Sequence, residues 1–404
     1  MCGKKNNFSV FPMNFLSQVL YIFLAVSDIF CYYKNFYQNV NIIYSNETLI
    51  ISYNKKYDKR AIQGGWHLRW SNPIKYMVLF GVNNVGVSKA LSFFSQQTCL
   101  RFKNVQNLRG SSGIIYKRAN ICASQVGRQS MSHPQDILIT NHCNDNAGIQ
   151  HETLHALGLE HEMARMDRDN YIILNKHNMQ PGSNDDYRKE PGTINYNLRY
   201  DFGSLMHYDR HVYTKNNELT TVTRNKHYLK TIGQSRRASF YDIKVINLHY
   251  CNHICKIKLK CYHQGYTDPN DCSKCKCPSF YGGRNCEQLL PSDGSCPEQK
   301  YKASNVYQTL YVHGAKKCFF QLEADSGYKI KLILVRSVLP YSRVCQPNIG
   351  LETKFLQDKG VSGARFCGND NNEVIISGGR FVTIGYFSGN QNNYFELKYK
   401  VTKG

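Results

Sequence analysis

The chain has 404 residues, of which 42% are hydrophobic and 13% aromatic, a composition typical of folded globular domains and not of disordered chains. Its 51 Lys and Arg residues outnumber 29 Asp and Glu residues, for a formal net charge of +22. The basic residues are spread along the chain, without a dense block or a nucleic-acid motif, so we expect a basic surface and no nucleic-acid partner. This length predicts roughly two or three domains.

The N-terminus has the layout of a cleaved signal peptide. A pair of lysines precedes an apolar run over residues 15–26, and small residues stand three and one positions before Asp28. The run is shorter than the roughly 20 residues of a membrane-spanning helix. Residues 1–27 are therefore predicted to be removed on secretion, and we expect a secreted, extracellular protein with no membrane span.

Sixteen cysteines in a secreted chain indicate disulfides. Two of them, Cys2 and Cys31, lie in or beside the segment that secretion should remove, so by count the mature chain has no unpaired thiol. The other fourteen form three groups: Cys99, Cys122, Cys143 and Cys251; Cys255, Cys261, Cys272, Cys275, Cys277 and Cys286; and Cys296, Cys318, Cys345 and Cys367.

The segment "HETLHALGLEHE", which begins at His151, contains three histidines spaced four and six residues apart. Apolar residues over 147–159 predict a helix, on which His151 and His155 face the same way about one turn apart. Two imidazoles so placed can bind one zinc ion. His161 can join them only if the helix ends after His155, and Gly158 permits this because glycine adopts the left-handed backbone conformation at little cost.

Three histidine ligands indicate a catalytic zinc site. A structural site is normally closed by four protein ligands, whereas three neutral histidines leave one position open for water. Glu152 follows the first ligand, where it can reach that water but not the metal. The pattern H-E-x-x-H-x-x-G-x-x-H specifies five positions, which makes a chance match very rare.

This segment, with Glu162 after the third histidine and the "RMDRD" that ends it, resembles the zinc-binding signature of the astacin family of metzincin endopeptidases, of the nematode type. "SLMHYD" resembles the family's Met-turn, which implies that Met206 lies beneath the zinc and that Tyr208 offers a hydroxyl to the transition state. "IGQSRRASFYDIKVINLHYC" resembles the end of astacin catalytic domains. The implied fold class is α+β: a two-lobed metzincin domain, a small disulfide-rich EGF-like module and an all-β CUB-like sandwich.

The stretch "KRAIQGGWHLRW" resembles the dibasic processing site and first strand of a mature astacin. Cleavage after Arg60 would leave Ala61 with a free ammonium, which the resemblance directs toward Glu162. The expected zymogen has a signal peptide at 1–27, a propeptide at 28–60 and a catalytic domain at 61–252. The prosegment lacks the family's F-x-G-D motif, so the sequence does not identify the group that keeps the zymogen latent.

The C-terminal part resembles two extracellular modules. "GYTDPNDCSKCKCPSFYGGRNCE" resembles an EGF-like module, expected at 253–287; "CSKCKC" is also compatible with a zinc knuckle, which a disulfide-rich secreted chain disfavours. Residues 296–401 resemble a CUB-like domain without the acidic cluster of calcium-binding members, and 380–401 read as two alternating strands joined by a polar turn. The resemblance implies the disulfides Cys99–Cys251, Cys122–Cys143, Cys277–Cys286, Cys296–Cys318 and Cys345–Cys367.

The implied function is that of a secreted zinc-dependent endopeptidase with one Zn2+ per chain. A zinc-bound water has a lowered pKa, Glu152 takes its proton as general base, and the metal and Tyr208 stabilise the oxyanion. Substrate should lie extended along an edge strand within 124–140. Arg237, in the segment after "IGQ", is expected to bind an acidic residue on the carboxyl side of the cut bond; the alternative is that Arg236 and Arg237 are solvated loop charges.

Expected partners are protein or peptide substrates, including extracellular-matrix or host proteins, with the EGF-like and CUB-like modules making protein contacts. Two other functions fit parts of the chain. A degenerate astacin would act only as a secreted binding protein, yet every expected ligand, the base, the methionine and the tyrosine are present together. A glycan or matrix adhesion protein would need a basic face on the CUB-like module, which a linear sequence does not show.

Overall fold

The computed structural model describes residues 40–45, 48–53, 62–65 and 69–403. The predicted signal peptide and the cleavage site after Arg60 lie outside these residues. The chain divides into two compact units, Met1–Tyr57 and Asp58–Gly404. In the first unit, β1 (Val40–Ser45) and β2 (Thr48–Tyr53) pair as an antiparallel hairpin. The second unit contains the histidine motif.

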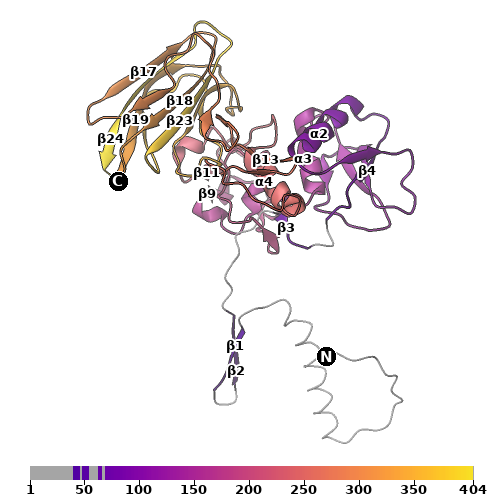
Figure 1. Ribbon diagram of the computed structural model, residues 1–404. Helices are drawn as coiled ribbons and strands as arrows, with labels where there is room; N and C mark the ends of the chain where they lie inside the picture. Colours follow the sequence, from indigo (N-terminus) through magenta and orange to yellow (C-terminus); the bar gives the residue numbers. More distant parts are fainter. Residues whose placement is uncertain (1–39, 46–47, 54–61, 66–68, 404) are drawn as a thin grey trace, which may run out of the picture. The chain divides into compact units, whose positions relative to one another are not determined.

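A five-stranded sheet with two helices forms the first part of the second unit (Figure 1). Buried side chains of the sheet, such as Ile114 and Ile137, share one core with the helices. Tyr116 links sheet to helix, since its hydroxyl lies 2.9 Å from Thr153 Oγ1. The strands run in the order β5 (Phe102–Asn104), β4 (Ile74–Val78), β6 (Ile114–Arg118), β8 (Gln135–Ile139) and β7 (Ala123–Ser124), with only β7 antiparallel; the helices are α2 (Asn84–Gln97) and α3 (Asn146–Ala156).

The stretch from residue 157 to 251 contains mostly short elements around one longer helix. That helix, α4 (Phe240–Ile246), starts with a capping box formed by Ser239 and Asp242 and continues directly into η7 (Asn247–Cys251). The paired strands are β3 (Ile62–Gln63) with β10 (Thr193–Ile194) and β9 (Ile172–Leu174) with β11 (Thr221–Thr223). The single turns are η2 (Glu162–Ala164), η3 (Arg168–Asn170), η4 (Lys176–Asn178), η5 (Asp185–Tyr187) and η6 (Lys226–Tyr228).

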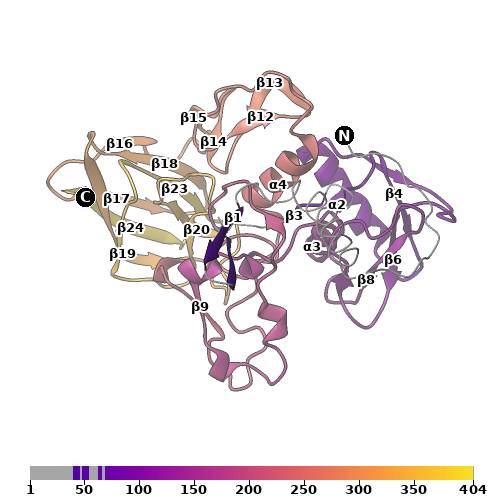
Figure 2. The same cartoon turned by 90° about the horizontal axis from the view of Figure 1, so that it is seen from below.

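Three disulfides hold the small region from residue 255 to 289, whose strands β12 to β15 are labelled in Figure 2. Few apolar side chains are buried here, so the cross-links stabilise a region that lacks a sizeable core. Its strands are β12 (Tyr266–Asp268) with β13 (Asp271–Lys276) and β14 (Tyr281–Gly282) with β15 (Gln288–Leu289). The structure contains all five disulfides implied by the resemblance, and it pairs the other four cysteines of the three groups as Cys255–Cys272 and Cys261–Cys275.

Residues 300–403 form a two-sheet β-sandwich, visible in Figure 1 as the orange and yellow strands. Side chains from both sheets, among them Phe320 and Leu397, share one buried core. One sheet has the order β16 (Lys300–Lys302), β18 (Lys317–Glu323), β23 (Phe381–Phe387), β20 (Gly350–Lys354) and β21 (Ala364–Phe366). The other has the order β17 (Gln308–His313), β24 (Tyr394–Lys403), β19 (Tyr328–Val338) and β22 (Glu373–Ile376).

The two strands expected over 380–401 are present as β23 and β24, but they belong to different sheets. The polar turn between them therefore carries the chain from one layer of the sandwich to the other. The expected alternation of buried and exposed positions is incomplete, because β23 is central in its sheet and almost wholly buried.

The sandwich packs directly on the part of the chain that carries the histidines. A continuous apolar core includes Phe202 and Tyr228 on one side and Phe355 of the sandwich on the other. The Phe202 and Tyr228 rings stack at 4.3 Å, and the Tyr228 and Phe355 rings lie 5.6 Å apart. At the edge of this core, the Asp201 carboxylate accepts hydrogen bonds from the backbone N–H (2.9 Å) and hydroxyl (3.2 Å) of Ser362.

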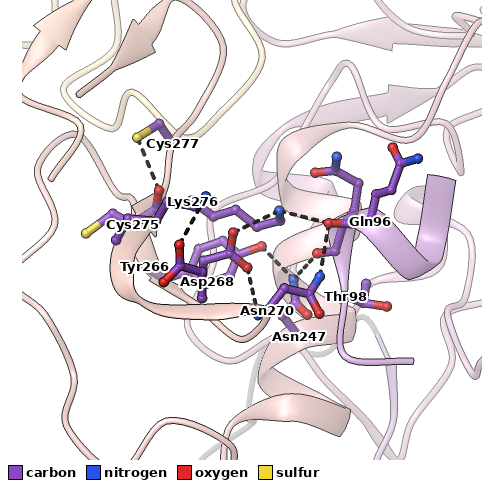
Figure 3. Close-up of polar contacts among 12 residues, drawn as sticks. Gln96, Thr98, Asn247, Tyr266, Asp268, Asn270, Cys275, Lys276 and Cys277 are labelled. Atoms are coloured by element: carbon purple, nitrogen blue, oxygen red, sulfur yellow. Dashed lines mark hydrogen bonds and ion pairs between the residues drawn. The ribbon is translucent and has the colours of Figure 1, made fainter. Parts of the chain in front are cut away.

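The disulfide-rich region is attached to the end of α2 through polar contacts, drawn in Figure 3. Asn270 Nδ2 and Lys276 Nζ both donate to the carbonyl oxygen of Gln96, at 3.0 Å and 3.3 Å. Asn247 Nδ2 donates to the Tyr266 hydroxyl at 2.7 Å. None of the helices that the structure describes is long and apolar enough to cross a bilayer.

Candidate metal centre

Helix α3 positions the first two histidines and then ends abruptly. Asp145 caps its N-terminus by accepting from the Gly148 N–H at 2.7 Å. The helix extends over Asn146–Ala156, so the expected span of 147–159 was too long at its C-terminus. Gly158 has a φ of +103°, and the N–H groups of Gly158 and Leu159 donate back to the helix at 2.8 and 2.9 Å. This is the glycine-dependent ending that places residues after it alongside the helix.

The carbonyl groups at the end of α3 accept hydrogen bonds from residues distant in sequence. The His155 carbonyl accepts from Gly127 N–H, the Ala156 carbonyl from Trp70 Nε1 and the Leu157 carbonyl from the Tyr250 hydroxyl, at 2.9, 2.6 and 2.9 Å. A helix end buried without such partners would be destabilised by several unpaired acceptors. The helix end is therefore held by its surroundings, and with it the position of His155.

The three histidines converge as the spacing predicted. Nε2 of His161 lies 3.2 Å from Nε2 of His151 and 3.1 Å from Nε2 of His155. They form the one cluster of potential metal ligands found among the described residues, with ligand atoms all within 4.8 Å of one another. Imidazole nitrogens at this separation can all bind a single ion of zinc size.

Hydrogen bonds on the far side of two rings fix which nitrogen faces the cluster. Nδ1 of His151 lies 3.0 Å from the carbonyl oxygen of Leu205, and Nδ1 of His155 lies 2.8 Å from that of Leu159. Because a carbonyl only accepts, both Nδ1 atoms carry the proton, and both Nε2 atoms keep a lone pair for a metal. Burial lowers the pKa of His151, lowers the pKa of His155 to about 3 and lowers that of His161 well below its usual value. The rings are therefore neutral, the state that binds metal.

Glu152 is buried beside the cluster without joining it. Its side chain is 6% exposed, and Oε2 has no hydrogen-bond partner among the described residues. Burial raises its pKa to about 7. A buried, unpartnered carboxylate oxygen is costly unless a ligand or water uses it. The donor set of three neutral histidines with a spare carboxylate fits zinc with a bound water, as in catalytic rather than structural sites.

The Met-turn is held against the histidines by Asp242, the residue that also caps α4. Its carboxylate accepts from the Ser204 hydroxyl at 2.6 Å and from the Leu205 N–H at 2.9 Å. Met206 is fully buried, and its carbonyl accepts from the Glu162 N–H at 2.9 Å. Sequence reasoning missed Asp242, although the S-x-x-D pattern of the capping box that contains it was readable.

Glu162 accepts hydrogen bonds from two groups that the sequence did not indicate. Its Oε1 accepts from Arg165 Nη1 at 3.0 Å and from the Asp201 N–H at 2.7 Å. Arg165 is 2% exposed and also pairs with Asp167 at 2.9 Å. Burial raises the pKa of Glu162 to about 8, with Arg165 acting against that rise. Ala61, expected to approach Glu162, lies outside the described residues.

Tyr208 lies next to the third histidine. Its ring centroid is 4.5 Å from that of His161 and 5.5 Å from that of Tyr187. Burial raises the pKa of Tyr208 above its ordinary value, and a side-chain hydrogen bond joins it to Tyr213. The hydroxyl therefore stays protonated and can act as a donor. Tyr213, which has a φ of +59°, was not singled out from the sequence.

The fold bears on two other predictions, which concern the substrate-binding strand within 124–140 and the role of Arg237. The antiparallel edge strand β7 (Ala123–Ser124) extends into the range 124–140 only with Ser124, because the chain then turns at Gly127 and re-enters the sheet as the internal strand β8. Arg237 lines a cavity together with Glu352 and Arg365 of the sandwich, and no histidine of the cluster lines that cavity. Arg236 does not line it.

Comparison with known proteins agrees with this geometry. Residues 65–251 match the sequence model of the peptidase family described as Astacin. Zinc metalloproteinase nas-34 of Caenorhabditis elegans is 32% identical over 349 residues, covering 85% of this chain and 57% of that protein. Zinc metalloproteinase dpy-31 of Brugia malayi is 32% identical over 295 residues, covering 70% and 49%. The structure of high choriolytic enzyme 1, a hatching enzyme zinc-protease from Oryzias latipes, is 29% identical with a TM-score of 0.44, covering 47% of this chain and 100% of that one.

The helix with two histidines, the glycine turn to a third and the methionine turn packed against them define a domain of the metzincin class. More narrowly, residues 65–251 match the sequence model of the astacin family of peptidases. The chain spans about half the length of the curated relatives it matches.

Proposed function

We propose that this protein is a secreted zinc-dependent endopeptidase that hydrolyses peptide bonds in protein substrates. The observation that carries the proposal is the convergence of three neutral histidine Nε2 atoms beside Glu152, whose Oε2 is buried and unpartnered among the described residues. The match of residues 65–251 to the astacin family model supports it. The relatives named above are themselves described as zinc metalloproteinases.

Each residue of the centre has a proposed task. His151, His155 and His161 hold one zinc ion, which when bound supplies a Lewis acid and a water of lowered pKa. Glu152 acts as general base and accepts a proton from the water at its free carboxylate oxygen. It then acts as general acid and delivers that proton to the leaving amine. Tyr208 donates a hydrogen bond from its hydroxyl to the oxyanion that forms when water attacks the peptide carbonyl. Met206, Gly158 and Glu162 position these groups.

The experiment that tests the proposal is Glu152→Gln in the mature chain. Glutamine keeps the shape of the side chain and leaves all three histidines in place, so zinc content and fold should be retained. Without a base, peptidase activity should fall by at least about a hundredfold, since general acid–base groups contribute about 10²–10⁴-fold. Wild-type zinc content with activity within about tenfold of wild type would remove Glu152 from the mechanism.

The domain organisation and maturation are further parts of the proposal. We assign the signal peptide to 1–27, the propeptide to 28–60, the catalytic domain to 61–252, an EGF-like module to 253–287 and a CUB-like domain to 296–401. Cleavage after Arg60 activates the zymogen. The two C-terminal modules contact protein partners, among which extracellular-matrix or host proteins are candidates.

A preference for an acidic residue after the cut bond is a separate proposal that depends on Arg237. Its guanidinium forms no hydrogen bond or ion pair with other described residues, so it is free to bind a carboxylate, a contact worth about 1.5–3 kcal/mol. Peptides that differ only in Asp, Asn or Ala at that position test it. Equal kcat/KM values for the three peptides exclude the preference, and an Asp preference that disappears in Arg237→Ala supports it.

A further inference from the structure

A cavity of about 260 Å³ lies where three parts of the chain meet. Arg237 belongs to the histidine-bearing part, Lys276 to the disulfide-rich region, and Lys354, Arg365 and Glu352 to the sandwich; all five line the cavity. The metal-binding histidines and Tyr208 do not line it. The cavity is therefore distinct from the proposed catalytic centre.

The charge around this cavity is unbalanced. Four of its lining side chains are cationic and Glu352 is the one acidic side chain among them. Both oxygens of Glu352 are already used, Oε1 by the Gly363 N–H at 2.9 Å and Oε2 by Arg365 Nε at 3.0 Å. Although burial opposes it, Arg365 and Lys354 hold the pKa of Glu352 below its ordinary value. This single lining carboxylate does not neutralise all four cations, although Asp268 lies near Lys276 and Asp201 and Asp358 act on Lys354 from outside the lining.

Several donors at the cavity are unused. The Arg237 guanidinium has no hydrogen-bond or ion-pair partner in the described part of the chain, and Nη1 of the buried Arg365 has no partner there either. Lys354 donates only to the carbonyl oxygens of Lys359 and Val361, at 2.9 and 2.7 Å. The charge of Lys276 is the best compensated of the four, because its Nζ lies 3.5 Å from Asp268 Oδ2 (Figure 3).

Cations withdrawn from water without enough counter-charge are costly, because a low-dielectric surrounding weakens their solvation and strengthens their mutual repulsion. Loss of solvation lowers the pKa of the buried Lys354, although Glu352, Asp201 and Asp358 act against that fall. An anion with several acceptor oxygens would remove the imbalance and use the free guanidinium donors. Arginine suits this role because its donors form a fixed fork that matches an oxyanion.

We propose that this cavity binds a doubly charged oxyanion, sulfate or phosphate, which bridges Arg237, Lys276 and Arg365 and so fastens the three parts of the chain together. The ion is a structural ligand and takes no part in peptide hydrolysis. Its binding should stabilise the folded chain by mass action in proportion to its occupancy. Peptide hydrolysis itself does not depend on this proposal, but the acidic preference proposed above for Arg237 is its alternative, because the same guanidinium is assigned to a different ligand.

The test is thermal unfolding of the mature chain in rising concentrations of sodium sulfate, against sodium chloride at matched ionic strength. We expect sulfate to raise the midpoint with a saturable dependence in the millimolar range, beyond the effect of chloride. In Arg237→Ala, the half-saturating concentration should rise about tenfold or more, because a charge-assisted contact is lost. The matched control is Arg236→Ala, which removes an adjacent exposed charge outside the cavity and should behave as the wild type does. Phosphate in place of sulfate should give the same pattern.

Three outcomes overturn the proposal. A sulfate effect that is linear, or equal in both variants, means general salting-out or an adventitious ion only. No shift beyond chloride means that the cavity binds no oxyanion. Displacement of sulfate by an Asp-containing substrate peptide but not by its Asn counterpart means that the cavity receives a substrate carboxylate instead. Arg237 lines the cavity but remains exposed to solvent, so loss of fold in Arg237→Ala is not expected to obscure the result.

Discussion

Asp201 offers a direct test of whether the sandwich and the histidine-bearing part fold as one structure. Its side chain is 2% exposed and accepts from the backbone N–H of Ser362 at 2.9 Å, the Ser362 hydroxyl at 3.2 Å and the Gly203 N–H at 3.2 Å. Its own N–H donates to Glu162 at 2.7 Å. The perturbation is Asp201→Ala, which deletes the acceptor and leaves the backbone bond in place.

The expected cost follows from the donors that lose their partner. Two buried backbone N–H groups, of Ser362 and Gly203, are left unpaired, and each costs about 1–3 kcal/mol. The free energy of unfolding should therefore fall by about 2–6 kcal/mol. Ser362→Ala removes only a hydroxyl and should cost about 1 kcal/mol. The site has little room to relax, since an atom at the Cβ position of Gly203 would lie 2.4 Å from Ser362 Cβ.

The assay is equilibrium urea unfolding followed by tryptophan fluorescence. Of the chain's two tryptophans, Trp70 is buried and donates from Nε1 to the Ala156 carbonyl oxygen, so its signal reports on the histidine-bearing part. Asp325→Ala is the matched control, because Asp325 pairs with Lys302 at 3.0 Å but its side chain is 67% exposed. An exposed pair contributes only about 0–1 kcal/mol.

The reasoning is refuted if Asp201→Ala shifts the tryptophan-detected free energy of unfolding no more than Asp325→Ala does. A shift in Asp201→Ala with none in Ser362→Ala would exclude the Ser362 hydroxyl and leave the backbone N–H groups of Gly203 and Ser362 as the source of the shift. Double-mutant analysis of Asp201→Ala with Ser362→Ala should be non-additive, since the two residues share a hydrogen bond.

Three further predictions concern the metal centre and maturation. Tyr208→Phe should lower kcat more than it raises KM, because the hydroxyl acts mainly on the transition state; steady-state kinetics showing a change in KM alone would assign it to substrate binding. Gly158→Ala should destabilise the fold by about 1–2 kcal/mol in urea unfolding, because its φ of +103° is one that residues with a side chain rarely adopt; an unchanged midpoint would contradict this. A chain whose Lys59-Arg60 site is blocked should be weakly active against a peptide library, and full activity would show that the prosegment is not inhibitory.

The local sequence was sufficient to predict that the three histidines converge. A helical period places His151 and His155 on one face, and a glycine at position 158 allows the chain to return with His161; both effects act over a few residues and are readable without a partner. The end of the helix was placed too late, at 159 instead of Ala156, because apolar residues continue past it. Gly158 ends the helix, and the tertiary donors Trp70 and Tyr250 pair with carbonyl groups at that end.

The groups that orient these ligands were decided by the tertiary structure alone. His151 depends on the carbonyl of Leu205, which lies 54 residues away, and the Met-turn depends on Asp242, 38 residues beyond Ser204. Arg165 was within the recognised signature, yet its pairing with Glu162 follows from joint burial and not from its identity. The same holds for β23 and β24, whose alternation predicts strands but does not specify their sheets.

The cavity shows the same division between sequence and structure most clearly. The sequence provides three isolated cations in three separate parts of the chain. Lys276 and Arg365 cannot be told from ordinary surface charges, and Arg237 was predicted only to bind substrate. These cations face one another with too little negative charge nearby only after folding has brought them around one cavity. Electrostatic energies depend on distance and burial, and neither quantity is fixed by position along the chain when the groups are so far apart in sequence.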